Sequence, residues 1–271
     1  MKFADFFTTD NRFEFIEAVK AGEEPWSILW SMGSLMNDFF SNRARQSPDK
    51  FFDLISVNHA ALPAGHGEDW SILVRVSTHT SGPVCIPERK IFIAAGVFLE
   101  AGAMIKGPCI IGQDCEIRHG AYIRGGVIVG KGCVVGHATE MKNSIIMDHS
   151  NAGHFNYLGD SVVGSRANLG AGSILANLKF RQREEIISGE IKKIRTTGHK
   201  GNRVDTGVSK LGAVIGDFSE VGCNTVALPG ALVGSDCWIY PNTTLPRGVY
   251  PSGSIIKNRG ALEVDVAKRD L

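Results

Sequence analysis

A six-residue repeat constrains this chain more than any other feature. From Ile93 onward, an aliphatic residue or a methionine recurs at every sixth position. These positions are Ile93, Leu99, Ile105, Ile111, Ile117, Ile123, Val129, Val135, Met141 and Met147, and later Ile215, Val221, Ala227, Val233, Ile239 and Leu245. Small residues such as Ala103 and Ala121 follow most of them four positions later. A fixed period indicates stacked units that bury one continuous core.

This period resembles the hexapeptide repeat of left-handed parallel β-helices, in which three hexads form one triangular coil. The resemblance implies that the aliphatic residue fills the core and that the small residue lies beside a tight corner. Four cysteines take the small position, namely Cys109, Cys115, Cys133 and Cys237, and no CxxC motif occurs. We therefore expect packed, reduced thiols rather than disulfides or a metal site. The expected fold is a β-class, left-handed parallel β-helix with a small N-terminal α-helical region and one inserted loop or hairpin.

Two short helices are expected before the repeat. Asp10 is a candidate N-cap for a helix that stops at Gly22, and Pro25 suits the first turn of a second helix. In the second helix one apolar face contains Ile28, Leu29, Met32, Leu35, Met36 and Phe39. Residues 58–90 are expected to be irregular, with a short strand near 72–76. The predicted division is a helical cap and linker at 1–90 and a β-helix domain at 91–271.

Residues 178–212 interrupt the repeat and form a predicted insertion. It is rich in cations, which are Arg181, Arg183, Lys192, Lys193, Arg195, Lys200 and Arg203. We expect a hairpin that turns at Ser188 and Gly189. The charges form either a solvated loop face or a loop that reaches a neighbouring subunit and contacts the phosphates of coenzyme A.

Charge and hydropathy exclude several classes of partner. The net charge is +1, which gives no support for a nucleic-acid-binding or polybasic membrane surface. No run of 18 apolar residues occurs, and the first residues lack the pattern of a signal peptide. We expect a cytoplasmic protein without nucleic-acid or membrane partners.

Three cations recur at the period of one full coil. Lys106, Arg124 and Lys142 are 18 residues apart, and each directly follows an aliphatic core position. They are expected to stack on one face, where like charges repel one another. A bound phosphate or carboxylate would relieve the repulsion. The alternative is a solvated basic ladder with acidic neighbours.

Residues 123–177 carry an ordered set of polar motifs between the core positions. The motifs are Ile123-Arg124-Gly125, Glu140-Met141-Lys142, Ala152-Gly153-His154, Tyr157-Leu158-Gly159-Asp160 and Asn168-Leu169-Gly170-Ala171-Gly172 with Asn177. This set resembles the acetyltransferase half of GlmU, the bifunctional glucosamine-1-phosphate acetyltransferase and N-acetylglucosamine-1-phosphate uridylyltransferase. Residues 177–180 and 205–213 resemble the archaeal-type sugar-1-phosphate nucleotidyltransferases, which carry a related β-helix.

The resemblance implies a role for each matching residue. His154 matches the catalytic base, and Arg124 and Lys142 match residues that hold the sugar phosphate. Tyr157 and Asn168 match further substrate-binding positions. The positions near acyl-CoA are Ala171, Asn177, Cys223 and Pro241. No metal is needed for acetyl transfer, and members assemble as homotrimers with each site between subunits.

Some residues depart from the GlmU pattern. Leu178 stands in place of a tyrosine, Cys223 in place of a serine and Pro241 in place of an alanine. These changes bear on the acyl donor and the sugar more than on the chemistry. Residues 1–90 contain no glycine-rich nucleotide loop, so no nucleotidyl transfer is expected.

The expected function is acetyl transfer from acetyl-CoA to the amine of a hexosamine 1-phosphate, with glucosamine 1-phosphate as the favoured acceptor. Two alternatives stay open. One is a γ-type carbonic anhydrase, because His149 and His154 have the spacing of its zinc ligands and His119 from a neighbouring subunit is a candidate third ligand. The other is a non-catalytic, trimeric scaffold that binds a sugar phosphate.

Overall fold

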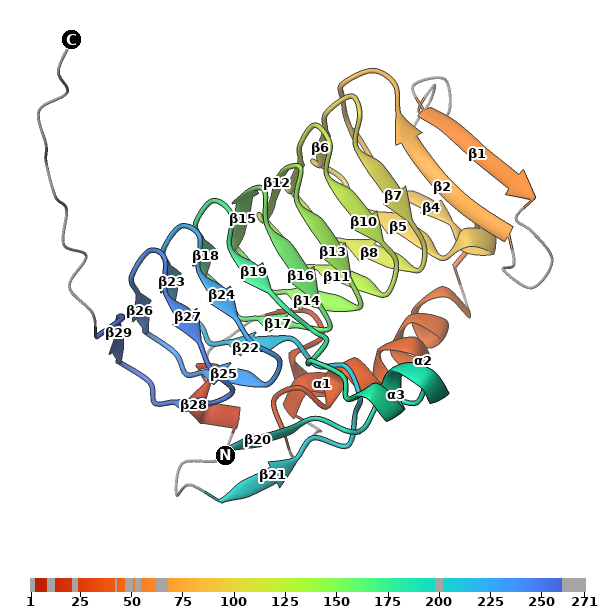
Figure 1. Ribbon diagram of the computed structural model, residues 1–271. Coiled ribbons are helices and arrows are strands. Elements are labelled where there is room, and N and C mark those ends of the chain that lie inside the picture. The colour runs from red at the N-terminus through yellow and green to blue at the C-terminus, as the bar shows by residue number, and fades with distance from the viewer. Residues whose placement is uncertain are drawn as a thin grey trace, which may run out of the picture.

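The chain forms a left-handed parallel β-helix, whose three nine-stranded sheets are the faces of a triangular prism (Figure 1). The computed structural model describes residues 3–8, 13–20, 24–41, 43–46, 51, 55–61, 68–197 and 202–259. The fold class predicted from the repeat is confirmed. Each turn of the chain adds one short strand to each face, so residues far apart in sequence become neighbours in adjacent coils.

The strands of the three faces are as follows. Face 1 contains β1 (Ile55–Ala61), β2 (Glu68–Val74), β7 (Met104–Lys106), β10 (Tyr122–Arg124), β13 (Glu140–Lys142), β16 (Tyr157–Gly159), β19 (Ile174–Leu175), β24 (Val226–Ala227) and β27 (Thr244–Leu245). Face 2 contains β4 (Val84–Ile86), β5 (Ile91–Ile93), β8 (Cys109–Ile111), β11 (Val127–Val129), β14 (Ser144–Ile146), β17 (Val162–Val163), β22 (Ala213–Ile215), β25 (Ala231–Val233) and β28 (Gly248–Tyr250). Face 3 contains β3 (Thr78–His79), β6 (Phe98–Leu99), β9 (Glu116–Ile117), β12 (Val134–His137), β15 (Asn151–His154), β18 (Asn168–Leu169), β23 (Glu220–Val221), β26 (Trp238–Ile239) and β29 (Ile255–Ile256).

The core of the prism follows the predicted repeat except at one position. Ile123 lies beside Met141 in the next coil, a step of 18 residues. Val129 lies beside Ile146, because the corner after Lys142 is one residue shorter than the corner after Arg124. The prediction of Met147 as a core position is therefore wrong, since Ile146 fills the prism and Met147 packs outside it. A six-residue count cannot detect a corner that loses one residue.

The cysteines occupy the small positions that the repeat predicts. Cys109, Cys115, Cys133 and Cys237 are buried free thiols inside the prism. Burial raises the pKa of the Cys109 thiol to about 12. These thiols are packing groups, and within the described residues no group of three His, Cys, Asp or Glu side chains is placed to hold a metal.

Antiparallel strands close the first coil. β1 pairs with β2, β2 pairs with β7, and β3 and β4 pair with β6 and β5. The expectation of an irregular segment at 58–90 is wrong for these strands, while the strand expected near 72–76 is the end of β2. The antiparallel strands cover sheet edges that would otherwise present unpaired backbone groups. They lie on the N-terminal side of residue 90, and the predicted division of the chain at that residue remains a proposal.

The N-terminal segment covers face 2. It contains η1 (Phe3–Asp5), α1 (Ile16–Lys20) and α2 (Ile28–Ser41), which lie along the prism (Figure 1). The carbonyl of Phe6 accepts a hydrogen bond from the amide of Asp217 at 2.8 Å, whereas Phe39 packs on Phe92 with ring centroids 5.2 Å apart. The segment therefore runs from the late coils back to the early ones. The outward-facing residues that it buries are Ile110, Ile128, Ile145, Val162, Val214 and Leu232.

The apolar face predicted for the second helix is confirmed. Ile28, Leu29, Met32 and Met36 are buried on α2, in contact with the outward side of face 2. The proposed N-cap Asp10 and the stop at Gly22 lie outside the described residues. No helix in the described part of the chain is long and apolar enough to cross a membrane.

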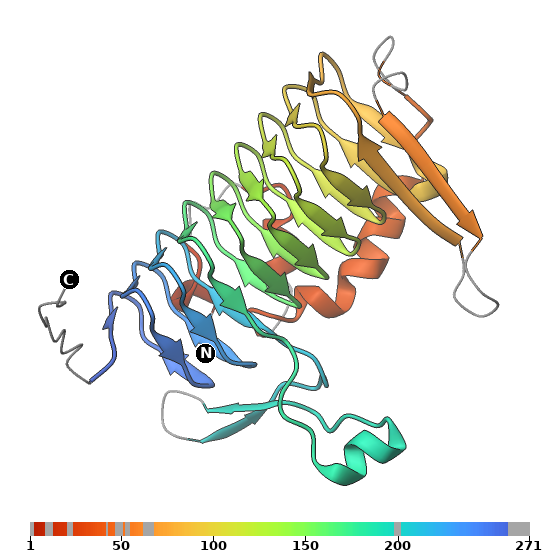
Figure 2. The ribbon, with the colours of Figure 1, turned by 45° about the horizontal axis from the view of Figure 1, so that its top comes forward.

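The insertion leaves the prism between β19 and β22 as an arm (Figure 2). It contains α3 (Arg183–Ser188) and a hairpin of β20 (Arg195–Thr197) and β21 (Arg203–Asp205). The hairpin turn predicted at Ser188 and Gly189 is wrong, because Gly189 instead ends α3 in the left-handed conformation with φ of 75°. Thr196 Oγ1 donates to the carbonyl of Gly230 at 2.7 Å, which fixes the arm to the late coils.

Candidate active site

Four predicted site residues share one corner of the prism, between faces 3 and 1. His154 ends β15 at this corner, and its carbonyl accepts a hydrogen bond of 2.9 Å from the corner of the next coil. The carbonyls of Ala171 and Cys223 accept equivalent bonds of 2.9 and 2.8 Å, the second from the residue that follows Pro241. His154, Ala171, Cys223 and Pro241 therefore form one column, which we call the donor column.

His154 differs from the two histidines that precede it on the same corner. Nδ1 of His119 lies 2.6 Å from the carbonyl of Ala101, and Nδ1 of His137 lies 2.8 Å from the carbonyl of His119. Their rings stack with centroids 5.5 Å apart. The imidazole of His154 is exposed and has no hydrogen-bond partner among the described residues. Its ring nitrogens are thus accessible to a ligand, in contrast to a buried, hydrogen-bonded histidine.

The backbone around His154 is held by hydrogen bonds, although the imidazole ring makes none among the described residues. The amide of His154 donates to Oδ1 of Asn156 at 3.1 Å. Asn156 is buried and its Nδ2 donates to the carbonyl of Gly170 at 2.8 Å. Phe155 adopts a left-handed φ of 53°, which turns the chain from face 3 to face 1 directly after the histidine. The side chain therefore projects from a fixed corner.

The predicted cation column lies on the outer side of face 1. Lys106 and Arg124 are direct neighbours on β7 and β10, and Lys142 ends β13 in the next coil. Nη1 of Arg124 lies 2.6 Å from Oε1 of Glu140, so one acidic neighbour is present. The ion pair reduces the charge repulsion within the chain, and the argument for a bound anion rests on Lys142 together with the exposed part of Arg124.

Tyr157 belongs to a network of amides and one carboxylate. The network lies at the side of face 1 away from the His154 corner. Its hydroxyl donates to Oδ1 of Asn177 at 3.4 Å. Nδ2 of Asn177 donates to Oδ2 of Asp160 at 2.5 Å, and Nδ2 of Asn143 donates to Oδ1 of Asp160 at 2.7 Å. Burial, and then the carboxylates of Glu140 and Asp160, raise the pKa of the Tyr157 phenol, which stays protonated and able to donate. The network fixes the orientation of the Asn177 amide.

Close packing explains the glycine that precedes Asp160. A Cβ atom at Gly159 would lie 2.7 Å from Nδ2 of Asn177 and 2.7 Å from the Tyr157 hydroxyl. Asp160 and Asn143 were not predicted as site residues. Asp160 stands in the Tyr157-to-Asp160 motif, so its signal was present in the sequence, whereas Asn143 becomes its neighbour only through coil stacking.

Asn168 lies on a different face from the other substrate residues. It begins β18 on face 3, where its Nδ2 donates to Oε2 of Glu220 at 3.0 Å. Arg124, Lys142 and Tyr157 lie on face 1, across the corner that holds His154. The structure thus brings the predicted residues to two faces that meet at the donor column, and it does not place Asn168 beside Tyr157 within one chain.

The histidines of the zinc alternative are separated in the fold. His149 and His154 flank β15 at two different corners of the prism. His149 is exposed, with a left-handed φ of 59°, and His119 is held by the carbonyl of Ala101. The described part of one chain contains no group of three His, Cys, Asp or Glu side chains placed to hold a metal ion.

A cavity of about 390 Å³ lies next to the Asp160 network. It is lined by Asn143 and Asp160 from the β-helix, Trp30 from α2, and Lys210 from the chain that returns from the arm. The N-terminal segment and the insertion thus meet at this end of face 1.

Comparison with known proteins finds relatives of the repeat region. A family model described as the GMPPB C-terminal domain matches residues 85–197. A bifunctional sugar-1-phosphate nucleotidylyltransferase/acetyltransferase of Sulfurisphaera tokodaii is 38% identical over 112 residues, which cover 41% of this chain and 25% of that protein. A bifunctional GlmU protein of Synechococcus elongatus is 32% identical over 163 residues, which cover 60% of this chain and 26% of that protein. The repeat region matches GlmU-type relatives.

The resemblance to the GlmU-type acetyltransferase region is thereby confirmed for the hexapeptide repeat. The match spans about a quarter of the length of these relatives. Among solved structures, the UDP-N-acetylglucosamine acyltransferase of Campylobacter jejuni aligns at 17% identity with a TM-score of 0.30, covering 62% of this chain and 72% of that chain. The fold itself rests on the strand ladders described above.

Proposed function

We propose that the chain is an acetyl-CoA-dependent N-acetyltransferase that acts on a hexosamine 1-phosphate, with glucosamine 1-phosphate as the preferred acceptor. The observation that carries the proposal is the free imidazole of His154. It is the one histidine among the three described on its corner whose ring is not bound to the backbone. Histidine accepts a proton near neutral pH, which an attacking amine requires.

The proposed reaction is a direct acyl transfer. The amine nitrogen of the sugar attacks the thioester carbonyl of acetyl-CoA, and a new C–N bond forms. His154 accepts the proton that the nitrogen loses. The C–S bond then breaks, and the departing thiolate of coenzyme A takes up a proton. General-base catalysis of this kind contributes about 10²–10⁴-fold to the rate.

The sugar phosphate is proposed to bind on face 1. Arg124 offers a planar guanidinium that can hold two phosphate oxygens, and Lys142 adds a point charge. Tyr157 presents a polar group between these cations and the donor column, where it can contact the sugar hydroxyls. Because Asp160 fixes Asn177, which accepts from the Tyr157 hydroxyl, the Tyr157 contact would be formed with little loss of side-chain entropy.

The acyl donor is proposed to lie along the donor column. Ala171, Cys223 and Pro241 present small side chains at successive coils, so an extended chain can run parallel to the prism axis beside them. His154 stands at the early end of this series. A thioester bound there would place its carbonyl next to the base.

A homotrimer is proposed because the predicted residues lie on two faces. A ligand on face 1 of one subunit cannot also touch Asn168 on face 3 of the same chain without wrapping the corner. A face 3 supplied by a second subunit would complete the site. Sedimentation velocity tests this, since a monomer with full activity would contradict a site shared between subunits.

The experiment that tests the function is product detection by mass spectrometry after incubation with acetyl-CoA and glucosamine 1-phosphate. N-acetylated sugar phosphate is the expected product, and galactosamine 1-phosphate serves as the comparison acceptor. Binding of the sugar phosphate without turnover would favour the scaffold. Stoichiometric zinc together with CO₂ hydration would favour the carbonic anhydrase alternative.

Nucleotidyl transfer is not part of the proposed function. Incubation with UTP and N-acetylglucosamine 1-phosphate should release no pyrophosphate. Release of pyrophosphate in proportion to the enzyme would contradict this proposal.

A further inference from the structure

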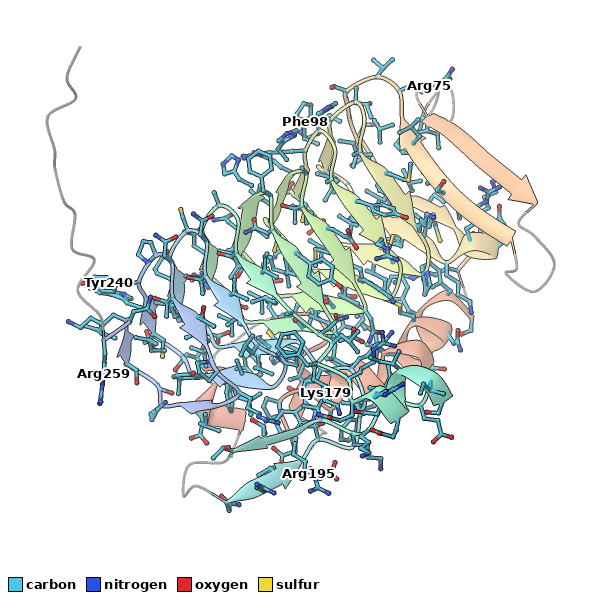
Figure 3. The ribbon with its side chains drawn as sticks, viewed as in Figure 1. Arg75, Phe98, Lys179, Arg195, Tyr240 and Arg259 are labelled. Carbon is cyan, nitrogen blue, oxygen red and sulfur yellow. The ribbon has the colours of Figure 1, made fainter. Side chains whose placement is uncertain are left out.

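A basic cleft lies between the arm and the last described coils. It has a volume of about 450 Å³ and is lined by Lys179, Lys192, Lys193, Arg195, Asp205 and Arg247. Five of these six residues are cations and one is a carboxylate. Lys179 lies where the arm leaves the β-helix, and Arg195 lies on β20 (Figure 3). The cations come from segments that are distant in sequence, so the fold itself concentrates the positive charge.

The arm holds its cations in fixed positions. Ile194 is buried, its amide donates to the carbonyl of Val208 at 2.7 Å, and its carbonyl accepts from the amide of Thr206 at 3.0 Å. Thr196 is also buried and bonded to Gly230. Because side chains alternate along an extended strand, Lys193 and Arg195 lie on the opposite side of this segment from the buried Ile194 and Thr196. Both are exposed on a backbone that cannot move freely.

One buried carboxylate supports the base of the cleft. Oε1 of Glu185 lies 2.8 Å from Nζ of Lys179 and accepts the amide of Lys192 at 2.8 Å. Its other oxygen accepts the amide of Gln182 at 2.9 Å. Glu185 therefore orders Lys179 and the backbone of Lys192. It does not neutralise Lys192, Lys193, Arg195 or Arg247, which have no carboxylate within salt-bridge distance among the described residues.

We propose that this cleft binds an anion with at least two phosphate groups on a nucleoside, and that in the working enzyme it holds the nucleoside bisphosphate end of the acyl donor. Converging lysines and arginines repel one another, and a multiply charged phosphate ligand offsets that repulsion. The volume is within the range of small-ligand pockets. A nucleic acid is disfavoured, because the chain has a net charge of only +1.

The position of the cleft indicates that the ligand is part of the acyl donor. This identification rests on the proposed function. Arg247 follows Pro241 of the donor column by six residues. Six residues span at most about 20 Å. The cleft therefore lies within the reach of a donor whose thioester end is at the donor column. The nucleoside end would bind at the arm, and the pantetheine chain would cross the late coils of face 1 to reach the donor column, along which its thioester end would lie.

The first test is calorimetric titration of the full chain with adenosine 3′,5′-bisphosphate. The wild type should bind it, and binding should weaken as salt is raised. The double variant Lys193→Ala/Arg247→Ala should raise Kd at least about tenfold, since it removes two charge-assisted contacts. Arg203→Ala is the matched control, because Arg203 is an exposed arginine of the same hairpin that does not line the cleft. Equal weakening in the control would overturn the site.

Uridine 5′-diphosphate in place of adenosine 3′,5′-bisphosphate distinguishes the two sources of nucleoside phosphate. Weaker binding of the uridine compound is expected, and tighter binding would overturn the assignment to the acyl donor. Absence of binding of both compounds would overturn the cleft itself. Arg247→Glu is the second variant, because it lies in the last coils and leaves the arm untouched. It should abolish binding in the same assay.

The second test uses acetyl-CoA and acetyl-pantetheine, which lacks the nucleoside bisphosphate. The double variant should raise KM for acetyl-CoA about tenfold and leave kcat/KM for acetyl-pantetheine unchanged. Equal losses with both donors would contradict a role in holding the nucleoside end. If the wild type transfers no acetyl group but binds adenosine 3′,5′-bisphosphate, the proposed function fails while the binding site stands.

Discussion

Asn177 donates a hydrogen bond to Asp160 across two stacked coils, with Nδ2 and Oδ2 2.5 Å apart. The second oxygen of Asp160 accepts the amide of Asn143 at 2.7 Å. One buried carboxylate therefore fixes two amides and, through Asn177, the hydroxyl of Tyr157. This relationship connects three coils of face 1 and fixes the acceptor to which the Tyr157 hydroxyl donates.

Replacement of Asp160 by Asn should loosen this network. Asparagine has the same shape as aspartate, but its NH₂ group would face the side-chain amide of Asn143 or Asn177, which is itself a donor. The free energy of unfolding should fall by about 1–3 kcal/mol. Asp236→Asn is the matched control, because Asp236 is exposed at a corner with a similar left-handed φ. Urea unfolding measures both, and equal stability of the two variants would contradict a structural role for Asp160.

Two glycines on adjacent coils provide a test of coil stacking. A Cβ atom at Gly136 would lie 1.7 Å from the carbonyl oxygen of Gly153, whereas a Cβ atom at Gly153 meets nothing within 4 Å. Gly136→Ala should lower stability by about 1–3 kcal/mol through overpacking. Gly153→Ala should change it by less than about 0.5 kcal/mol. Thermal unfolding of both variants measures the difference, and the reverse order would contradict the register of β12 and β15.

Glu185 should make the arm sensitive to acid. Lys179, with the amides of Gln182 and Lys192, lowers the pKa of the Glu185 carboxyl from 4.5 to about 2. A lowered pKa means that the stabilisation is present above about pH 4.5 and is lost as pH falls toward 2. Pepsin cleavage within residues 183–197 should therefore increase over this range before the circular dichroism of the β-helix changes.

The variant Glu185→Gln should open the arm at neutral pH. Exchange of the Lys192 amide, followed by NMR, should become at least about tenfold faster, because its hydrogen bond to a carboxylate is weakened. Glu184→Gln, at an exposed neighbouring position of α3, is the control. Equal exchange in both variants would contradict the role of Glu185.

Cys223 should be the fast-reacting thiol of the native protein. It is exposed on the donor column, while the other five cysteines are buried. A thiol reagent should label one cysteine rapidly and all six after unfolding. Cys223→Ser should remove the fast phase. Desulfo-coenzyme A should slow it in the wild type, and labelling unaffected by saturating amounts of that analogue would place the acyl donor elsewhere.

Much of the fold was predictable because the aliphatic core positions recur at a constant spacing of six residues. Ile105, Ile117 and Ile123 fill the prism as the hexads require. The shortened corner after Lys142 was not predictable, since one missing residue leaves the local pattern of Ile145, Ile146 and Met147 equally apolar. The coverage of face 2 by α1 and α2 depends on tertiary contacts that no local pattern encodes.

The candidate site was predictable only in part, and for a similar reason. His154, Arg124 and Tyr157 stand in short motifs whose residues are close in sequence. The pairing of Asn143 with Asp160, and of Arg124 with Glu140, arises between coils. The basic cleft likewise brings Arg247 to Lys193 across a long separation in the chain. Such contacts follow from stacking and not from spacing.

The most direct test of the account is the rate of acetyl transfer to glucosamine 1-phosphate by His154→Ala and His137→Ala, followed by mass spectrometry. His137 is the matched control, because it lies on the same corner with its ring bound to the backbone of the preceding coil. The account predicts that His154→Ala lowers kcat by about 10²–10⁴-fold and that His137→Ala retains most activity. Full activity in His154→Ala, in a protein that remains folded, would contradict the central claim.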